Sequence, residues 1–104
     1  MLYEMRTYRL KTGAVPQYLK LVGEEGIEIQ KQHLGNLAGC FFSEIGRINE
    51  IVHIWAYTDL NDREARRAAL AADARWQAFL PKLQALIEEM DNKILKAAPF
   101  SPLR

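Results

Sequence analysis

The chain has 104 residues, a length that predicts a single domain over residues 1–104. Its 49% hydrophobic and 26% charged residues are typical of a folded globular protein and exclude a disordered or fibrous one. The 14 Lys and Arg nearly balance the 13 Asp and Glu, which argues against a nucleic-acid-binding protein with its clustered basic residues. No apolar run approaches the roughly 18 residues of a membrane span. Charges also interrupt the N-terminal stretch, so we expect no signal peptide, no membrane association and a cytoplasmic location.

The first third of the chain predicts a strand followed by a long helix. Residues 2–10 alternate in polarity and are rich in Tyr, Met and Thr, as in a β-strand that ends at a turn containing Gly13. Pro16 favours the first turn of a helix, because its missing N–H costs nothing there, and the helix is predicted to reach about Gln32. Gly23 and Gly26 each disfavour this helix by about 1 kcal/mol relative to Ala, which indicates close backbone packing or a local irregularity.

Three further strands complete the predicted sheet. Residues 36–45 and about 48–58 form a hairpin, and a last strand is predicted at about residues 91–97. With the helices between them, the order is β-α-β-β-α-α-β. This order predicts the split βαβ, ferredoxin-like α+β fold, in which a four-stranded antiparallel sheet carries helices on one face and has its first and third strands in the middle.

The segment between the hairpin and the last strand predicts two helices. Asp59 or Asn61 can cap the first and Asp73 the second. Pro81 lies inside the second helix, where we expect a kink or a locally broken hydrogen bond. The basic run at residues 63–67 contains a glutamate and is interpreted as a solvated helix face.

Alternation along the two central strands divides their residues into two sets. Val52, Ile54 and Ala56 are small and aliphatic, so we expect this set to lie under the helices. The matching set on the first strand is Tyr3, Met5 and Thr7. The open face would then carry the remaining residues, Leu2, Glu4, Arg6, Tyr8, Leu10, Ile51, His53, Trp55 and Tyr57.

Such a mixture of aromatic and ionisable side chains is typical of a ligand cavity. His53 and Glu4 are the candidate catalytic acid or base, and Arg6 could orient an anionic group. The candidate substrate-binding residues are Arg6, Tyr8, Trp55 and Tyr57.

Structural roles are the alternative for the same residues. His53 could be hydrogen-bonded to Glu4 or Tyr8, Glu4 and Arg6 could form an ion pair, and the aromatic rings could fill an interface. A metal site is not predicted, because His33 is the only other histidine and Cys40 is the only cysteine. No cofactor is expected.

Several segments resemble the NIPSNAP family, in order and over essentially the whole chain. They are YEMRTYRLKTG, EEGIEIQKQHLG, FFSEIGRINEIVHIWAYTDLNDREARRAALAAD, WQAFL and ILKAAPFSPL. The resemblance implies a ferredoxin-like protomer and a dimeric α+β barrel, in which two sheets close face to face. It implies no agreed reaction, substrate or set of catalytic residues.

These observations support two hypotheses of different classes. The first is a homodimer that binds a small apolar or aromatic molecule in its barrel cavity, with cofactor-free proton transfer or oxygenation if it is an enzyme. The second is a non-catalytic interaction or assembly module, in which the aromatic face is the core of the dimer.

Overall fold

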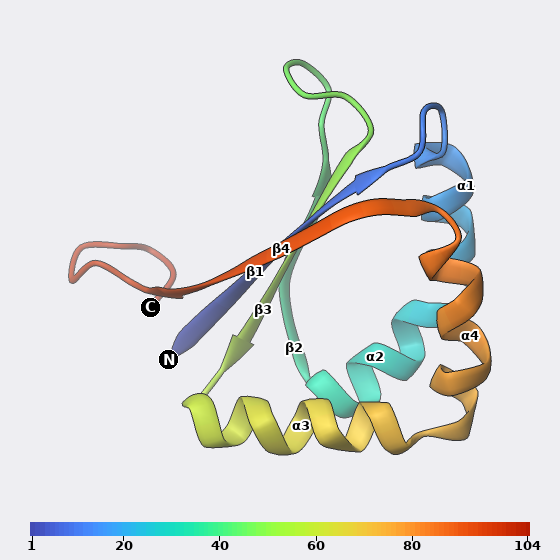
Figure 1. Ribbon diagram of the computed structural model, residues 1–104. Coiled ribbons are helices and arrows are strands. Elements are labelled where there is room, and N and C mark those ends of the chain that lie inside the picture. The colour runs from blue at the N-terminus through green and yellow to red at the C-terminus, as the bar shows by residue number, and fades with distance from the viewer.

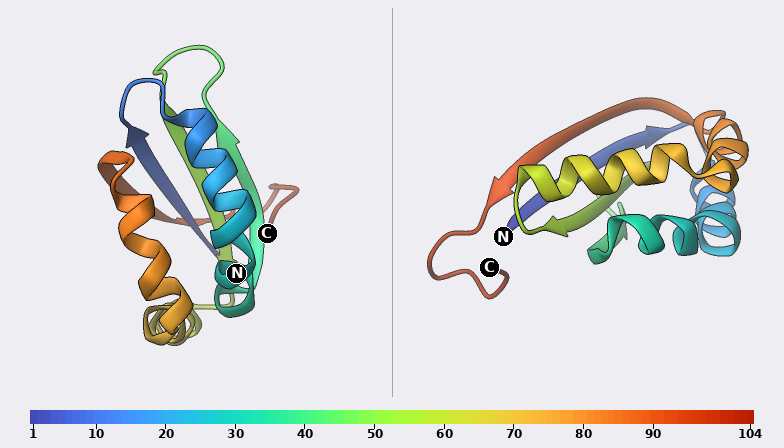
Figure 2. Two further views of the ribbon diagram at one scale, coloured as in Figure 1. Left: turned by 90° about the vertical axis from the view of Figure 1, so that its right-hand side faces the viewer. Right: turned by 90° about the horizontal axis from the view of Figure 1, so that it is seen from below.

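The computed structural model describes all residues, 1–104, and has the predicted ferredoxin-like α+β fold (Figure 1). Its four strands form one antiparallel sheet in the order β2-β3-β1-β4, so the predicted central position of the first and third strands is confirmed. The helices lie on one face of this sheet and leave the other uncovered (Figure 2). The elements are β1 (Leu2–Leu10), α1 (Val15–Leu21), η1 (Val22–Gly26), α2 (Ile27–Leu34), β2 (Asn36–Phe42), β3 (Glu50–Tyr57), α3 (Leu60–Ala72), α4 (Ala74–Gln84) and β4 (Ile87–Lys96).

The predicted first helix is interrupted by a π-helical turn, η1. A Cβ atom on Gly26 would lie 2.6 Å from the ring of Phe79 in α4, whereas one on Gly23 would meet nothing within 4 Å. Gly26 therefore permits the ring of Phe79 to approach η1 closely, so the expected close packing is present at Gly26 only, whereas the expected irregularity includes both glycines.

Each of the last two helices begins at an aspartate that caps its N-terminus. Asp59 accepts a hydrogen bond of 2.8 Å from the backbone N–H of Asp62, and Asp73 accepts one of 2.8 Å from that of Arg75. α4 continues through Pro81 to Gln84, although a proline has no N–H to donate.

β4 begins four residues earlier than predicted, and β2 ends three residues earlier. The start of β4 is missed because nearly all its residues are exposed, so burial imposes no apolar alternation on it.

The prediction of which face the helices cover is wrong. Ile51, His53, Trp55 and Tyr57 are at most 1% exposed under the helices, whereas Val52 and Ile54 lie on the uncovered face and are only half-buried. The larger side chains present more apolar area, so burying them stabilises the fold more than burying a Val and an Ile. Glu4 and His53 are buried with these side chains and Arg6 is partly buried, so all three need partners inside the protomer.

Candidate functional site

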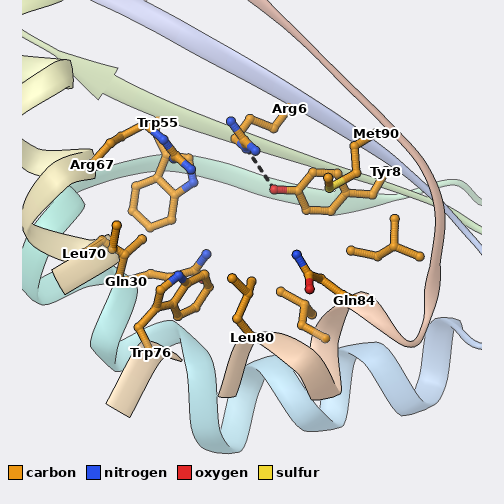
Figure 3. A pocket seen from close by; sticks show the side chains of 13 residues that line it. Arg6, Tyr8, Gln30, Trp55, Arg67, Leu70, Trp76, Leu80, Gln84 and Met90 are labelled. Carbon is orange, nitrogen blue, oxygen red and sulfur yellow. Dashed lines mark hydrogen bonds between the residues drawn. The ribbon is translucent and has the colours of Figure 1, made fainter. Parts of the chain in front are cut away.

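A cavity of about 260 Å³ lies between the helix-covered face of the sheet and the helices (Figure 3). Tyr8 and Trp55 project into it from the sheet, and Trp76 and Leu80 face them from α4. Both tryptophans of the chain therefore line one cavity. The complete lining consists of Arg6, Tyr8, Gln30, Trp55, Arg67, Leu70, Ala71, Trp76, Leu80, Leu83, Gln84, Ile87 and Met90.

The helices leave the β4 side of this cavity exposed. Met90 of β4 is paired with Tyr8 and belongs to the same face, yet it is 54% exposed. Ala71 and Gln84 are also exposed members of the lining. These three residues mark the opening of the cavity, between β4 and the helices α3 and α4.

At its polar end the cavity adjoins a buried carboxylate, that of Glu4, which is 0% exposed. Its Oε2 accepts hydrogen bonds from Arg6 at 3.0 Å, Arg63 at 2.8 Å and Asn92 at 2.8 Å. The Nη1 of Arg67 lies 3.9 Å from Oε1, which accepts no hydrogen bond. Burial alone would raise the pKa of Glu4, but the hydrogen bonds from Arg63 and Asn92 and the charge of Arg6 outweigh it and lower the pKa to about 2. The carboxylate is therefore ionised.

Arg6 connects this carboxylate to the cavity wall. Its Nε donates a hydrogen bond of 2.8 Å to the hydroxyl of Tyr8, and its guanidinium carbon lies 5.7 Å from the centre of that ring. Burial would lower the pKa of Arg6, but the neighbouring Tyr8 and Glu4 raise it, so the guanidinium stays charged.

His53 lies outside the cavity lining and is 1% exposed. Its Nε2 is 2.8 Å from the hydroxyl of Tyr18 in α1, and the ring of Tyr8 packs on it with 5.5 Å between centres. Burial first, and then the charge of Arg6, lower the pKa of His53 to about 4, so the imidazole is neutral at pH 7. The prediction of a hydrogen bond to Glu4 or Tyr8 is wrong, because the partners of Nε2 are the hydroxyl of Tyr18 and, at 3.9 Å, the Sγ of Cys40.

Of the six predicted site residues, three line the cavity: Arg6, Tyr8 and Trp55. Glu4 lies directly behind this wall, bound to Arg6. Tyr57 is buried on the same face of the sheet but outside the lining.

Arg63 and Arg67 are partners of Glu4 that were not predicted from the sequence. The interpretation of residues 63–67 as a solvated face is wrong for these two, because they contact Glu4 from α3. Their spacing carried a signal, since Arg63, Arg67 and Leu70 follow the i, i+4, i+7 pattern of one helix face, and Leu70 is 2% exposed.

No group of three or more His, Cys, Asp or Glu side chains could hold a metal ion. No helix has the length and apolar character needed to cross a membrane.

The NIPSNAP family model matches residues 3–102 of the chain. Among curated proteins, the chain is 36% identical to Protein NipSnap of Drosophila melanogaster and 34% identical to Protein NipSnap homolog 2 of Homo sapiens. These matches cover 97% and 99% of the chain, which spans only about a third of the length of these relatives (36% and 35%).

Solved structures of NIPSNAP proteins are also similar to this chain. A NIPSNAP family protein with unknown function from Agrobacterium tumefaciens is 67% identical, with a TM-score of 0.99 over 100% of this chain and 94% of the other. An uncharacterised NIPSNAP domain protein from Burkholderia xenovorans is 43% identical, with a TM-score of 0.94 over 98% and 99% of the two chains. An antibiotic biosynthesis monooxygenase has a TM-score of 0.64 at 16% identity, over 95% of this chain and 100% of the other, a likeness of fold alone.

Proposed function

The chain belongs to the NIPSNAP family, and from this premise we propose that it binds one small apolar or aromatic molecule in the cavity between sheet and helices. The observation that carries the proposal is the enclosed lining, in which Tyr8, Trp55 and Trp76 form aromatic walls around about 260 Å³. This volume is near the lower end of the range for ligand pockets and suits one or two fused rings.

Three of the predicted substrate-binding residues, Arg6, Tyr8 and Trp55, contact the ligand in this proposal. Tyr57 supports the wall from behind. The barrel cavity of a dimer is no longer the proposed location, because the helices of the protomer itself cover these residues.

Binding is favoured over acid–base chemistry by the composition of the lining. Apart from the phenol of Tyr8, whose hydroxyl accepts a hydrogen bond from Arg6, it contains no carboxylate, imidazole or thiol to exchange a proton with a substrate. The proposed role of His53 is to hold Tyr8 and Tyr18 in place. The proposed role of Glu4 is to orient Arg6.

A thermal-shift experiment with indole and 2-naphthol tests this proposal. A ligand at ~100 times its Kd stabilises the native state by about 2.7 kcal/mol, which raises the Tm of a domain of this size by several degrees. Ala71→Phe should abolish the shift, because Ala71 lies at the opening. Ala69→Phe is the matched control, since Ala69 is exposed on the same helix outside the lining. Absence of any shift in the wild-type protein would refute cavity binding.

The uncovered face of the sheet supports a homodimer as a further part of the proposal. Phe41, Ile54 and Leu95 lie on this face, and Phe41 is 58% exposed. Asp91 and Lys93 are neighbours on the same face of β4, so a twofold axis can pair the acidic residue of one copy with the basic residue of the other. These features favour a second copy of this chain as the occupant.

Sedimentation velocity at micromolar concentration tests the dimer. Ile54→Glu places a charge in the centre of the uncovered face and should yield monomers, because a buried unpaired charge costs several kcal/mol. Glu24→Gln, an exposed change on the opposite, helical side, should leave the dimer intact. A monomeric wild-type protein would refute this part of the proposal.

A further inference from the structure

We propose that the ligand of the cavity carries a single carboxylate, bound between Arg6 and Arg67 at the polar end, with its apolar body against Trp76 and Leu80. This inference rests on the proposed function, because it assigns a chemical class to the ligand of the same cavity.

The first observation is an excess of positive charge around Glu4. Arg6, Arg63 and Arg67 have this one carboxylate as their only ionic contact within 4 Å, at 3.0, 2.8 and 3.9 Å. Three guanidinium groups on one carboxylate leave a local charge of about +2. Asp62, an acidic residue of α3 itself, is already paired with Arg66. A second anion would therefore be attracted to this position.

The second observation is that two of these guanidinium groups reach the cavity. Arg6 and Arg67 belong to the lining, whereas Arg63 lies behind it. Their side chains are only 17% and 29% exposed, so bulk water compensates their charges only in part.

The third observation is that Arg6 and Arg67 engage only some of their guanidinium N–H groups in hydrogen bonds within the protein. Arg6 donates through Nε to Tyr8 and through Nη1 to Glu4, and its Nη2 makes no hydrogen bond. Arg67 stands beyond hydrogen-bond distance from Glu4, and its guanidinium also interacts with the hydroxyl of Tyr57, which leaves further N–H groups of Arg67 without an acceptor. Two planar guanidinium groups with free N–H donors at the same end of a cavity match the two oxygens of a carboxylate.

The other residues of the lining favour a carboxylate over a larger anion. Beyond Arg6 and Arg67, the polar members are Tyr8, two glutamines and the indole N–H groups, and the rest of the wall is apolar. A phosphate group has three terminal oxygens to satisfy and occupies more of a cavity of about 260 Å³. A monocarboxylate with a ring or short branched body leaves no oxygen buried against the apolar wall.

Calorimetric titration of the wild-type protein with three matched probes tests the inference. 2-Naphthoate and 2-naphthamide share a ring system and differ in charge, and 2-naphthyl phosphate carries the larger anion. We expect the carboxylate to bind about ten- to a hundredfold more tightly than the amide, the effect of one or two charge-assisted hydrogen bonds. We also expect it to bind more tightly than the phosphate.

Two substitutions on α3 test whether the preference for a carboxylate depends on Arg67. Arg67→Gln should weaken binding of 2-naphthoate about tenfold or more and leave binding of 2-naphthamide unchanged. Arg66→Gln is the control, because it removes the same charge from the adjacent residue, which lies outside the cavity.

The outcomes separate the inference from the proposed function. If the amide or the phosphate binds as tightly as the carboxylate, or if Arg67→Gln weakens amide and carboxylate equally, the inference is overturned and cavity binding stands. If none of the three probes binds, both are overturned.

Discussion

Replacing Glu4 by glutamine should cost about 3 kcal/mol of stability at pH 7. The substitution keeps the shape of the side chain and removes the only carboxylate within 4 Å of Arg6, Arg63 and Arg67. The magnitude follows from the pKa of Glu4, which is about 2 in the folded chain against 4.5 in the unfolded one. That difference corresponds to about 3 kcal/mol of folding free energy. It agrees with the cost of about 3–5 kcal/mol for breaking a buried ion pair.

The same pKa predicts how this contribution depends on pH. A carboxyl group whose pKa is lowered by folding stabilises the native state above its unfolded pKa and loses that effect as the pH falls through its folded pKa. The stability difference between wild type and Glu4→Gln should therefore be complete above about pH 4.5 and decrease between about pH 4.5 and 2.

Urea unfolding at a series of pH values, at one protein concentration, measures this difference. Glu64→Gln is the matched control, since Glu64 is exposed on α3 and forms no ion pair, and it should change stability by less than about 0.5 kcal/mol. A difference between wild type and Glu4→Gln that stays constant from pH 7 to 2 would refute the assignment of an ionised Glu4 as the counter-ion of the three arginines.

Two further predictions concern packing and pH. Gly26→Ala should destabilise the protein by about 1–3 kcal/mol, because the new Cβ would lie 2.6 Å from the ring of Phe79. Gly23→Ala should stabilise it by up to about 1 kcal/mol, because a Cβ at this position meets no atom within 4 Å. Equal effects of the two substitutions on thermal unfolding would contradict this packing. The pKa of His53 is about 4 in the folded chain and 6.5 in the unfolded one, so the unfolded state binds more protons in this range and stability should fall by up to about 3 kcal/mol as the pH drops from 6.5 to 4. His53→Gln should lose this decline and His33→Gln should keep it, and a decline that persists in His53→Gln would show that another group causes it.

The predicted element order and fold class were accessible from the sequence because they depend on local patterns. Alternation in residues 51–57 and caps such as Asp73 act over a few residues, and the structure contains the strand and the cap. The glycines of the first helix gave a correct signal of irregularity for the same reason, since Gly26 lies in a π-helical turn.

The ion-pair cluster could not be predicted in the same way. Glu4 is bonded to Arg63, 59 positions away, and to Asn92, 88 positions away. Such partners are brought together only when β4 pairs with β1 and α3 packs against the sheet, so no short segment of the chain contains the cluster.

The sequence by itself determined the strands and helices, their order, the family resemblance and the division of each central strand into two alternating sets. The tertiary structure decided which set the helices cover, and it placed His53, Trp55 and Glu4 inside the protomer instead of on its open face. The physical reason is that an alternating sequence divides the residues of a strand between two faces but does not say which face the helices cover. Only the total apolar area that the helices can bury, together with partners for the buried charges, distinguishes one face from the other.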